Sequence, residues 1–151
     1  MTSISLRAAA PGDAKVVARL LGELGYPTAP GDVPARLEAV VSEGGAVLLA
    51  SQGDDEPAGL LALARHKVIH APGPVAYITG LVTAPEARGR GIGRAMVEAA
   101  ADWARSENCV KLSVTSAEHR GDAHAFYPSC GMPHSGRRYS MTIEPPPRVR
   151  N

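Results

Sequence analysis

A glycine-dense loop between two apolar segments is the stretch of this sequence best suited to bind a ligand. It runs from Leu81 to Arg94, and a segment of helical character follows to about Glu107. Glycine has no Cβ, so the backbone of such a loop can approach a ligand closely. The first turn of a helix leaves N–H groups unpaired and carries a partial positive charge. Since Arg88, Arg90 and Arg94 add full charges around it, we infer a site for a diphosphate.

The glycine spacing excludes two common phosphate-binding motifs. A dinucleotide fingerprint needs glycine at its first, third and sixth positions, but the sixth residue is an arginine counted from Gly89 and a methionine counted from Gly91. A Walker-type loop ends in Gly-Lys-Ser/Thr, and no lysine lies in this loop. The pattern that remains is Arg88-x-x-Gly91-x-Gly93.

This pattern, placed after an apolar strand and before an amphipathic helix, resembles the signature of the GNAT superfamily of acyl-CoA-dependent N-acyltransferases. The resemblance implies that main-chain N–H groups of the loop cradle the pyrophosphate of coenzyme A. It also implies that the fourth and fifth strands splay apart and that the fourth offers main-chain groups to the pantetheine arm, with acetyl-CoA as the co-substrate. The residues that it assigns to coenzyme A are Leu81, Val82, Thr83, Arg88, Gly89, Arg90, Gly91, Ile92, Gly93 and Arg94.

A second motif, Ala123-x-x-Phe126-Tyr127-x-x-x-Gly131-Met132, resembles the family's tyrosine-bearing helix. In that resemblance Tyr127 is the catalytic general acid. Tyrosine titrates near 10 and a thiol near about 8.5, so a tyrosine hydroxyl can protonate a leaving thiolate while staying neutral at rest. The alternative is that Tyr127 is a packed aromatic residue. Two positions depart from the family pattern, because Met132 replaces the usual Phe and Arg120 the usual Asn.

The sequence does not identify a base for the acceptor amine. An alkylamine with a pKa near 10.4 is protonated at pH 7, and freeing its lone pair costs roughly 4.6 kcal/mol. Many relatives place a glutamate on the fourth strand, where this chain has Tyr77. The remaining candidates are His66, His70, Glu118 and His119. For each of them a solvated loop residue is the favoured interpretation. An amine of low pKa would need no base.

Apolar periodicity predicts the elements that carry these residues. Strands are expected over 3–7, 46–51, 58–66, 75–83, 110–115 and 139–143, and helices over 13–25, 32–44, 92–107 and 122–127. Together with the resemblance, this indicates an α/β (α+β) fold with a mixed, largely antiparallel sheet of six to seven strands flanked by about four helices. We expect one domain over 1–143 and a proline-rich tail over 144–151.

Three helices are predicted to bury one apolar face each. Asp13 and Asp32 are expected to cap the first two helices. The predicted buried sets are Val16, Val17, Leu20, Leu21 and Leu24; Val33, Leu37, Val40 and Val41; and Ile92, Ala95, Met96, Ala99 and Trp103.

Charge and composition limit the classes of binding partner and the compartments that we expect for this protein. Sixteen basic and fifteen acidic residues give a net charge of +1, and only 4% of residues are aromatic, so we expect no nucleic-acid partner. No stretch reaches the ~18 apolar residues of a membrane span, and the sequence opens with no signal peptide or lipidation motif. We therefore expect a cytoplasmic protein with Cys109 and Cys130 as free thiols.

We also expect no metal centre. The histidines fall into two uneven groups, His66 and His70, and His119, His124 and His134. Neither group places two ligands on one rigid face beside a carboxylate.

These observations favour an N-acetyltransferase that passes the acetyl group of acetyl-CoA to a free amine, by direct attack in a ternary complex. The favoured interpretation is that the acceptor amine belongs to a small molecule. The alternatives are a protein or peptide acetyltransferase, acting on an N-terminus or a lysine, and a non-catalytic acyl-CoA-binding module. Because relatives often dimerise, the resemblance also allows a homodimer, although the sequence marks no interface.

Overall fold

The structure is a computed structural model that describes residues 3–114, 121–136 and 138–143. The chain divides into two compact units, residues 1–116 and 117–151. The first unit holds the sheet, three helices and the glycine loop, and the second holds one helix and the segment that follows it.

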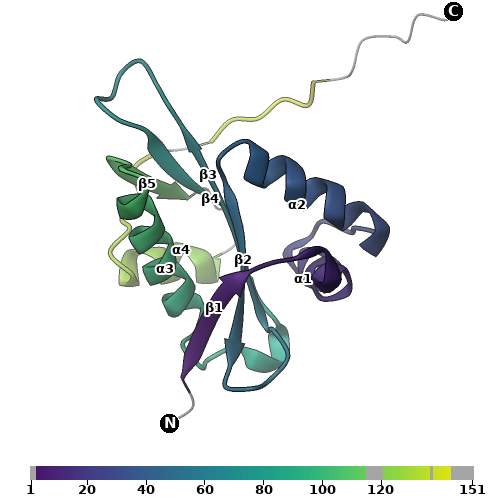
Figure 1. The fold of residues 1–151 in the computed structure, drawn as a ribbon. Helices are drawn as coiled ribbons and strands as arrows, with labels where there is room; N and C mark the ends of the chain where they lie inside the picture. Colours follow the sequence, from purple (N-terminus) through teal and green to yellow (C-terminus); the bar gives the residue numbers. More distant parts are fainter. Residues whose placement is uncertain (1–2, 115–120, 137, 144–151) are drawn as a thin grey trace, which may run out of the picture. The chain divides into compact units, whose positions relative to one another are not determined.

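The first unit is organised on a five-stranded sheet (Figure 1). The strands are β1 (Ile4–Ala8), β2 (Ala46–Gln52), β3 (Gly59–His66), β4 (Val75–Thr83) and β5 (Lys111–Val114). Their order in the sheet follows the sequence, with antiparallel pairing from β1 to β4 and parallel pairing of β4 with β5. This confirms the mixed, largely antiparallel sheet.

The strand count is lower than predicted. Tyr139, Met141 and Ile143 alternate with polar residues as a strand would, but in the described part of the chain this segment forms no strand, and these side chains are exposed. Alternation alone does not make a strand, because a strand needs a hydrogen-bonded neighbour.

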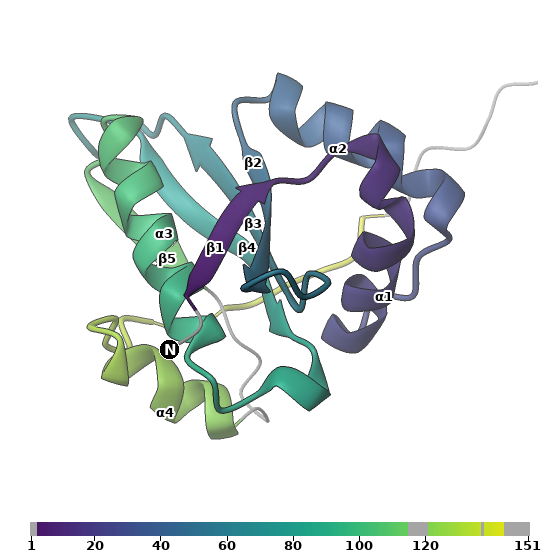
Figure 2. The same ribbon diagram turned by 60° about the horizontal axis from the view of Figure 1, so that its bottom comes forward.

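Helices of the first unit cover opposite faces of the sheet (Figure 2). On one face lie α1 (Ala14–Leu24) and α2 (Val33–Ser42), and on the other lies α3 (Ile92–Ser106). Short 3₁₀ turns precede these helices at Pro11–Asp13, Pro30–Asp32 and Pro85–Ala87. The second unit contains α4 (Gly121–Ser129).

The buried face of α1 agrees with the prediction, and those of α2 and α3 agree in part. Helix α1 buries Val16, Val17, Ala18 and Leu20, with Leu21 and Leu24 packed at the margin. Helix α2 buries Val33 and Leu37, but Val41 is 62% exposed. Helix α3 buries Ile92, Met96, Val97, Ala100 and Ala104.

The predicted face of α3 was wrong at three positions, since Ala95, Ala99 and Trp103 are only half-buried. The buried face lies instead toward Val97, Ala100 and Ala104, and α3 packs closely against Gly59 of β3. A Cβ placed on that glycine would lie 2.9 Å from Ile92 Cγ2 and 3.0 Å from Met96 Sδ.

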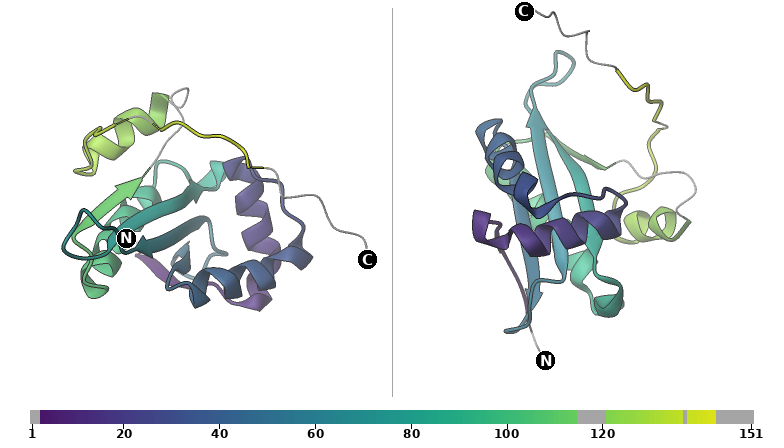
Figure 3. Two further views of the ribbon diagram at one scale, coloured as in Figure 1. Left: turned by 90° about the horizontal axis from the view of Figure 1, so that it is seen from above. Right: turned by 90° about the vertical axis from the view of Figure 1, so that its right-hand side faces the viewer.

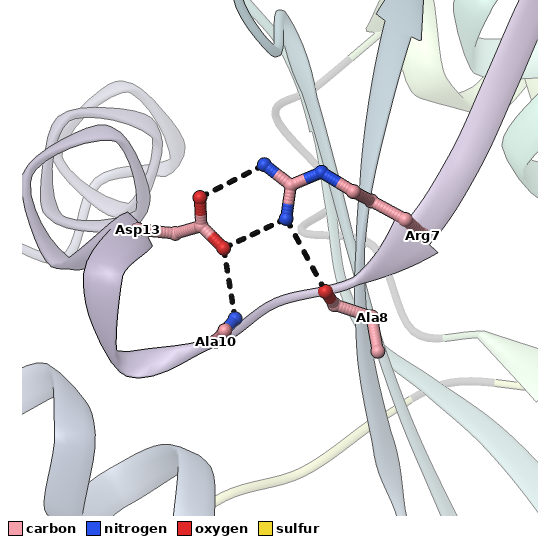
Figure 4. A network of polar contacts seen from close by, with 4 residues as sticks. All are labelled: Arg7, Ala8, Ala10 and Asp13. Atoms are coloured by element: carbon pink, nitrogen blue, oxygen red, sulfur yellow. Dashed lines mark hydrogen bonds and ion pairs between the residues drawn. The ribbon is translucent and has the colours of Figure 1, made fainter.

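The two predicted helix caps form no capping hydrogen bond from their side chains. Asp13 instead points back toward β1 (Figure 4). Its carboxylate accepts two hydrogen bonds of 2.8 Å from the Arg7 guanidinium and one of 2.8 Å from the Ala10 N–H. The hydrogen bonds from Arg7, which have the larger effect, and the one from Ala10 lower the pKa of Asp13 to about 2. The carboxylate thus fixes the path from β1 into α1.

The hairpin of β3 and β4 extends past the start of β2 (Figure 3). Strand β2 pairs with β3 only from Gly59 to Leu63, whereas β4 pairs with β3 as far as His66. Residues 64–66 of β3 therefore have β4 as their sole strand neighbour in the described sheet.

Candidate functional site

The glycine loop follows β4 directly and adopts a conformation that depends on its glycines. After the 3₁₀ turn, Arg88 is extended with φ −66° and ψ 153°. Gly89 and Gly91 then take left-handed conformations with φ of +79° and +84°. L-residues reach this region at a cost of roughly 1–2 kcal/mol, so glycine is the residue suited to both positions.

The same loop ends at the start of α3. Gly91 is the N-cap residue, and its carbonyl accepts the first hydrogen bond of the helix, 3.0 Å from the Ala95 N–H. A glycine has no side chain that could cap the helix, and helix geometry leaves the first-turn N–H groups without intrahelical acceptors. The arrangement predicted from the sequence, a strand followed by a glycine loop and a helix start, is therefore present and suits an anion.

The three arginines of the loop, Arg88, Arg90 and Arg94, are exposed. One of them, Arg90, donates a long hydrogen bond of 3.4 Å from Nη1 to Gln52 Oε1 on β2. Three exposed arginines beside the start of a helix favour a negatively charged ligand.

Arg19 of α1 contacts the 3₁₀ turn that precedes the glycine loop. Arg19 donates from Nη2 to the Pro57 carbonyl at 3.3 Å, and its Nη1 lies 3.6 Å from Glu86 Oε1. The Ala84 N–H also bonds to the Ala58 carbonyl at 2.7 Å. These contacts place the turn against the connection between β2 and β3.

Strand β4 changes register just before the residues predicted to hold the pantetheine arm. Ala62 of β3 faces Gly80, while Leu63 faces Ile78, so Thr79 is an extra residue that forms a β-bulge. On the other edge, the ladder with β5 ends at the pair Ile78 and Val114. No described residue of β5 pairs with β4 from Leu81 to Thr83.

The predicted acyl-CoA residues are therefore contiguous within the first unit, from the edge of β4 through the loop into α3. Val82 and Ile92 are buried, whereas Leu81, Thr83 and Gly93 are half-buried and Gly89 and Gly91 are exposed. Buried members anchor the loop and exposed members face solvent. The binding roles of these residues stay predictions.

Tyr127 lies on α4 in the second unit. Its side chain is half-buried, and its ring stands edge-on to that of Phe126, with centroids 5.1 Å apart. The helix runs through Pro128 to Ser129, two residues beyond the predicted end, and Gly131 follows with φ +86°. The catalytic role of Tyr127 stays a prediction.

The candidate bases have different surroundings. His66 is exposed at the end of β3, and its ring centroid lies 5.7 Å from that of Tyr77 on β4. His70 is exposed in the loop between these strands. Glu118 and His119 lie outside the described residues. The sequence alone gave no sign of the contact between His66 and Tyr77, because it depends on the strand register.

Among the residues whose placement is described, no group of three or more His, Cys, Asp or Glu side chains could hold a metal ion. His119 lies outside them. Within the described segments, none of the helices has the length and apolar character required to cross a bilayer.

Comparisons with a family model and with a curated relative both point to acetyltransferases. The model of the Acetyltransferase (GNAT) family matches residues 19–132. An aminoglycoside N(6')-acetyltransferase type 1 from Stenotrophomonas maltophilia is 31% identical over 146 residues, which are 93% of this chain and 95% of the relative.

Solved structures show the same fold. A putative acetyltransferase from Agrobacterium tumefaciens superposes with a TM-score of 0.81 at 28% identity, over 92% of this chain and 99% of its own. An aminoglycoside N-acetyltransferase solved in complex with CoA gives a TM-score of 0.81 at 15% identity, over 95% and 96% of the two chains. The likeness to these structures extends over nearly the whole chain.

Proposed function

Because this chain belongs to the acetyltransferase (GNAT) family, we propose that it transfers the acetyl group of acetyl-CoA to the free amine of a small molecule. The observation that carries the proposal is the pair of left-handed glycines, Gly89 and Gly91, at the start of α3. A small-molecule acceptor is supported by the name of the relative from Stenotrophomonas maltophilia.

The loop holds the diphosphate of acetyl-CoA. Main-chain N–H groups between Arg88 and Arg94 donate to phosphate oxygens, and the three arginines add charge. Hydrogen bonds to charged groups contribute roughly 1.5–3 kcal/mol each. Main-chain groups of Leu81, Val82 and Thr83 hold the pantetheine arm along the β4 edge that has no β5 partner in the described sheet. Anchoring both ends of the donor fixes the thioester carbonyl relative to the amine.

Transfer proceeds by direct attack. The neutral amine adds to the thioester carbonyl carbon, forming a C–N bond and a tetrahedral intermediate. The C–S bond then breaks, and the thiolate takes a proton from the Tyr127 hydroxyl, which recovers one from solvent. The nitrogen, which carries two hydrogens in the intermediate, loses one of them to water as a proton. The products are an N-acetyl amine and free coenzyme A.

The cysteines support transfer without a covalent intermediate. Cys109 is half-buried, and burial raises the pKa of its thiol, with Arg65 lowering and Glu107 raising it to lesser degrees. A raised pKa disfavours the nucleophilic thiolate. Cys109 and Cys130 are both free thiols, as expected in the reducing cytoplasm in which we place this reaction.

The direct test is thiol release. Purified protein is incubated with acetyl-CoA and a panel of primary amines, and free coenzyme A is measured with a thiol reagent, each amine against a reaction lacking it. We expect amine-dependent release and an N-acetyl product of matching mass. Binding of acetyl-CoA without release for any amine would show an acyl-CoA-binding module instead.

A further inference from the structure

Strand β4, which is proposed to hold the pantetheine arm, and its neighbour β3 contain no acidic residue. From Ala58 to Ala84, a stretch that spans all of β3 and β4, the sequence has no Asp or Glu. Its charged and titratable residues are Arg65, His66, Lys67, His70 and Tyr77. A substrate with several ammonium groups would find no carboxylate here to balance its charges.

The sheet face on which these residues lie follows from the contacts. A Cβ on Gly80 would lie 3.3 Å from Leu24 Cδ2 and 3.7 Å from the Cβ of Ala62, so this pair faces α1. Alternation along β3 puts His66 on the same face as Ala62. Tyr77 lies on the same face, because its ring is close to that of His66.

This face changes character at the bulge. Ala62 packs against the core cluster that α1 and α2 share with the sheet. Beyond Thr79, which is exposed, the face continues with half-buried Tyr77 and exposed His66. The β4 position that carries a carboxylate in many relatives therefore presents an aromatic ring, with a second ring beside it.

The end of α1 lies against the same face of the sheet at Gly80. Leu24 reaches Gly80, and Tyr26, two residues later, is 64% exposed. The Tyr26 N–H bonds back to the Leu21 carbonyl at 2.9 Å, which fixes the start of this loop to α1. Helix α1 itself contains a single acidic residue, Glu23.

From this arrangement, and resting on the proposed acetyltransferase function, we propose that the acceptor is an amine with one positive charge and an aromatic or apolar body. Aromatic rings pack against such a body and attract a single ammonium group. The absence of carboxylates from β3 and β4, with the exposed Lys67 after β3, disfavours polycations such as aminoglycosides. Arg65 adds no net charge there, because it is paired with Glu107 at 3.2 Å.

The experiment compares two kinds of acceptor in the thiol-release assay. Tyramine, 2-phenylethylamine and benzylamine carry one ammonium group on an aromatic body, and kanamycin carries several on a sugar. We expect kcat/KM for the best aromatic amine to exceed that for kanamycin by about tenfold or more. Equal or better turnover of kanamycin would overturn the inference and leave the proposed function standing. No release with any amine would contradict the function itself, and the inference with it.

Two variants test whether Tyr77 is responsible for the preference for aromatic amines. Tyr77→Leu should raise KM for the aromatic amines about five- to tenfold and leave the KM for acetyl-CoA unchanged, which also shows that the variant is folded. Tyr77→Phe should keep the preference because it keeps the ring. The matched control is Tyr139→Leu, since Tyr139 is 88% exposed outside the sheet. An equal loss for kanamycin and aromatic amines in Tyr77→Leu would overturn the assignment.

Discussion

The Arg7 guanidinium and the Asp13 carboxylate form a paired hydrogen bond, with both N–O distances 2.8 Å. This contact joins the end of β1 to the start of α1, the helix whose far end reaches Gly80. It lowers the pKa of Asp13 to about 2, below the unfolded value of about 3.9. The ionised carboxylate therefore stabilises the folded state.

The sign of this shift predicts a pH dependence. The stabilisation is complete above about pH 4 and is lost as the pH falls toward about 2. We expect Asp13→Asn to lower the urea midpoint by a constant amount between about pH 5 and 7, and by progressively less below about pH 4. Asp54→Asn, an exposed change in the turn between β2 and β3, should have little effect. A difference for Asp13→Asn that grows on acidification would contradict this account.

Gly59→Ala tests the packing of α3 on the sheet. The added methyl group would meet Ile92, Met96 and the Cβ of Ala50, the last at 3.1 Å. We expect a loss of about 1–3 kcal/mol in the free energy of unfolding. Gly22→Ala in α1 is the control, because nothing lies within 4 Å of its Cβ and alanine favours helix by about 0.5–1 kcal/mol. Equal stability of the two variants in urea would argue against the observed packing.

Local signals explain why the loop could be predicted from the sequence. Gly89, Gly91 and the start of α3 depend on residues within a few positions of one another, and the structure has the left-handed glycines and the helix start that this spacing suggests. The apolar face of α1 was predictable for the same reason, since its side chains recur at helical spacing.

Features that depend on distant residues were missed. Helix α3 buries Val97, Ala100 and Ala104, which its apolar spacing alone did not indicate, and Val41 fits the apolar pattern of α2 yet is exposed. The bulge at Thr79 and the meeting of His66 with Tyr77 follow from the pairing of β3 with β4. A one-residue change of register would separate these rings.

Gly91→Ala should weaken acetyl-CoA binding. The alanine must take φ near +84° or distort the start of α3, so we expect the dissociation constant to rise at least about tenfold. Gly44→Ala is the matched control, because Gly44 has φ +86° at the end of α2. It should lose similar stability while calorimetry gives unchanged acetyl-CoA affinity. A parallel loss of affinity in both variants would mean that strain alone is responsible.

Tyr127→Phe should separate chemistry from binding. Without the hydroxyl, the thiolate loses its proton donor, and we expect kcat to fall by on the order of 10²-fold or more, with acetyl-CoA binding retained. Tyr139→Phe removes an exposed hydroxyl and should leave kcat unchanged. Turnover near the wild-type level in Tyr127→Phe would assign that residue to packing.

The most direct measurement is a calorimetric titration of the purified protein with acetyl-CoA and, separately, with S-acetylpantetheine, which lacks the diphosphate and the nucleotide. We expect one acetyl-CoA to bind per chain and the shorter thioester to bind at least about 10²-fold more weakly, because it forms no hydrogen bonds with the loop from Arg88 to Arg94. Equal binding of the two thioesters, or no heat with acetyl-CoA, would contradict the assignment of this loop to the diphosphate.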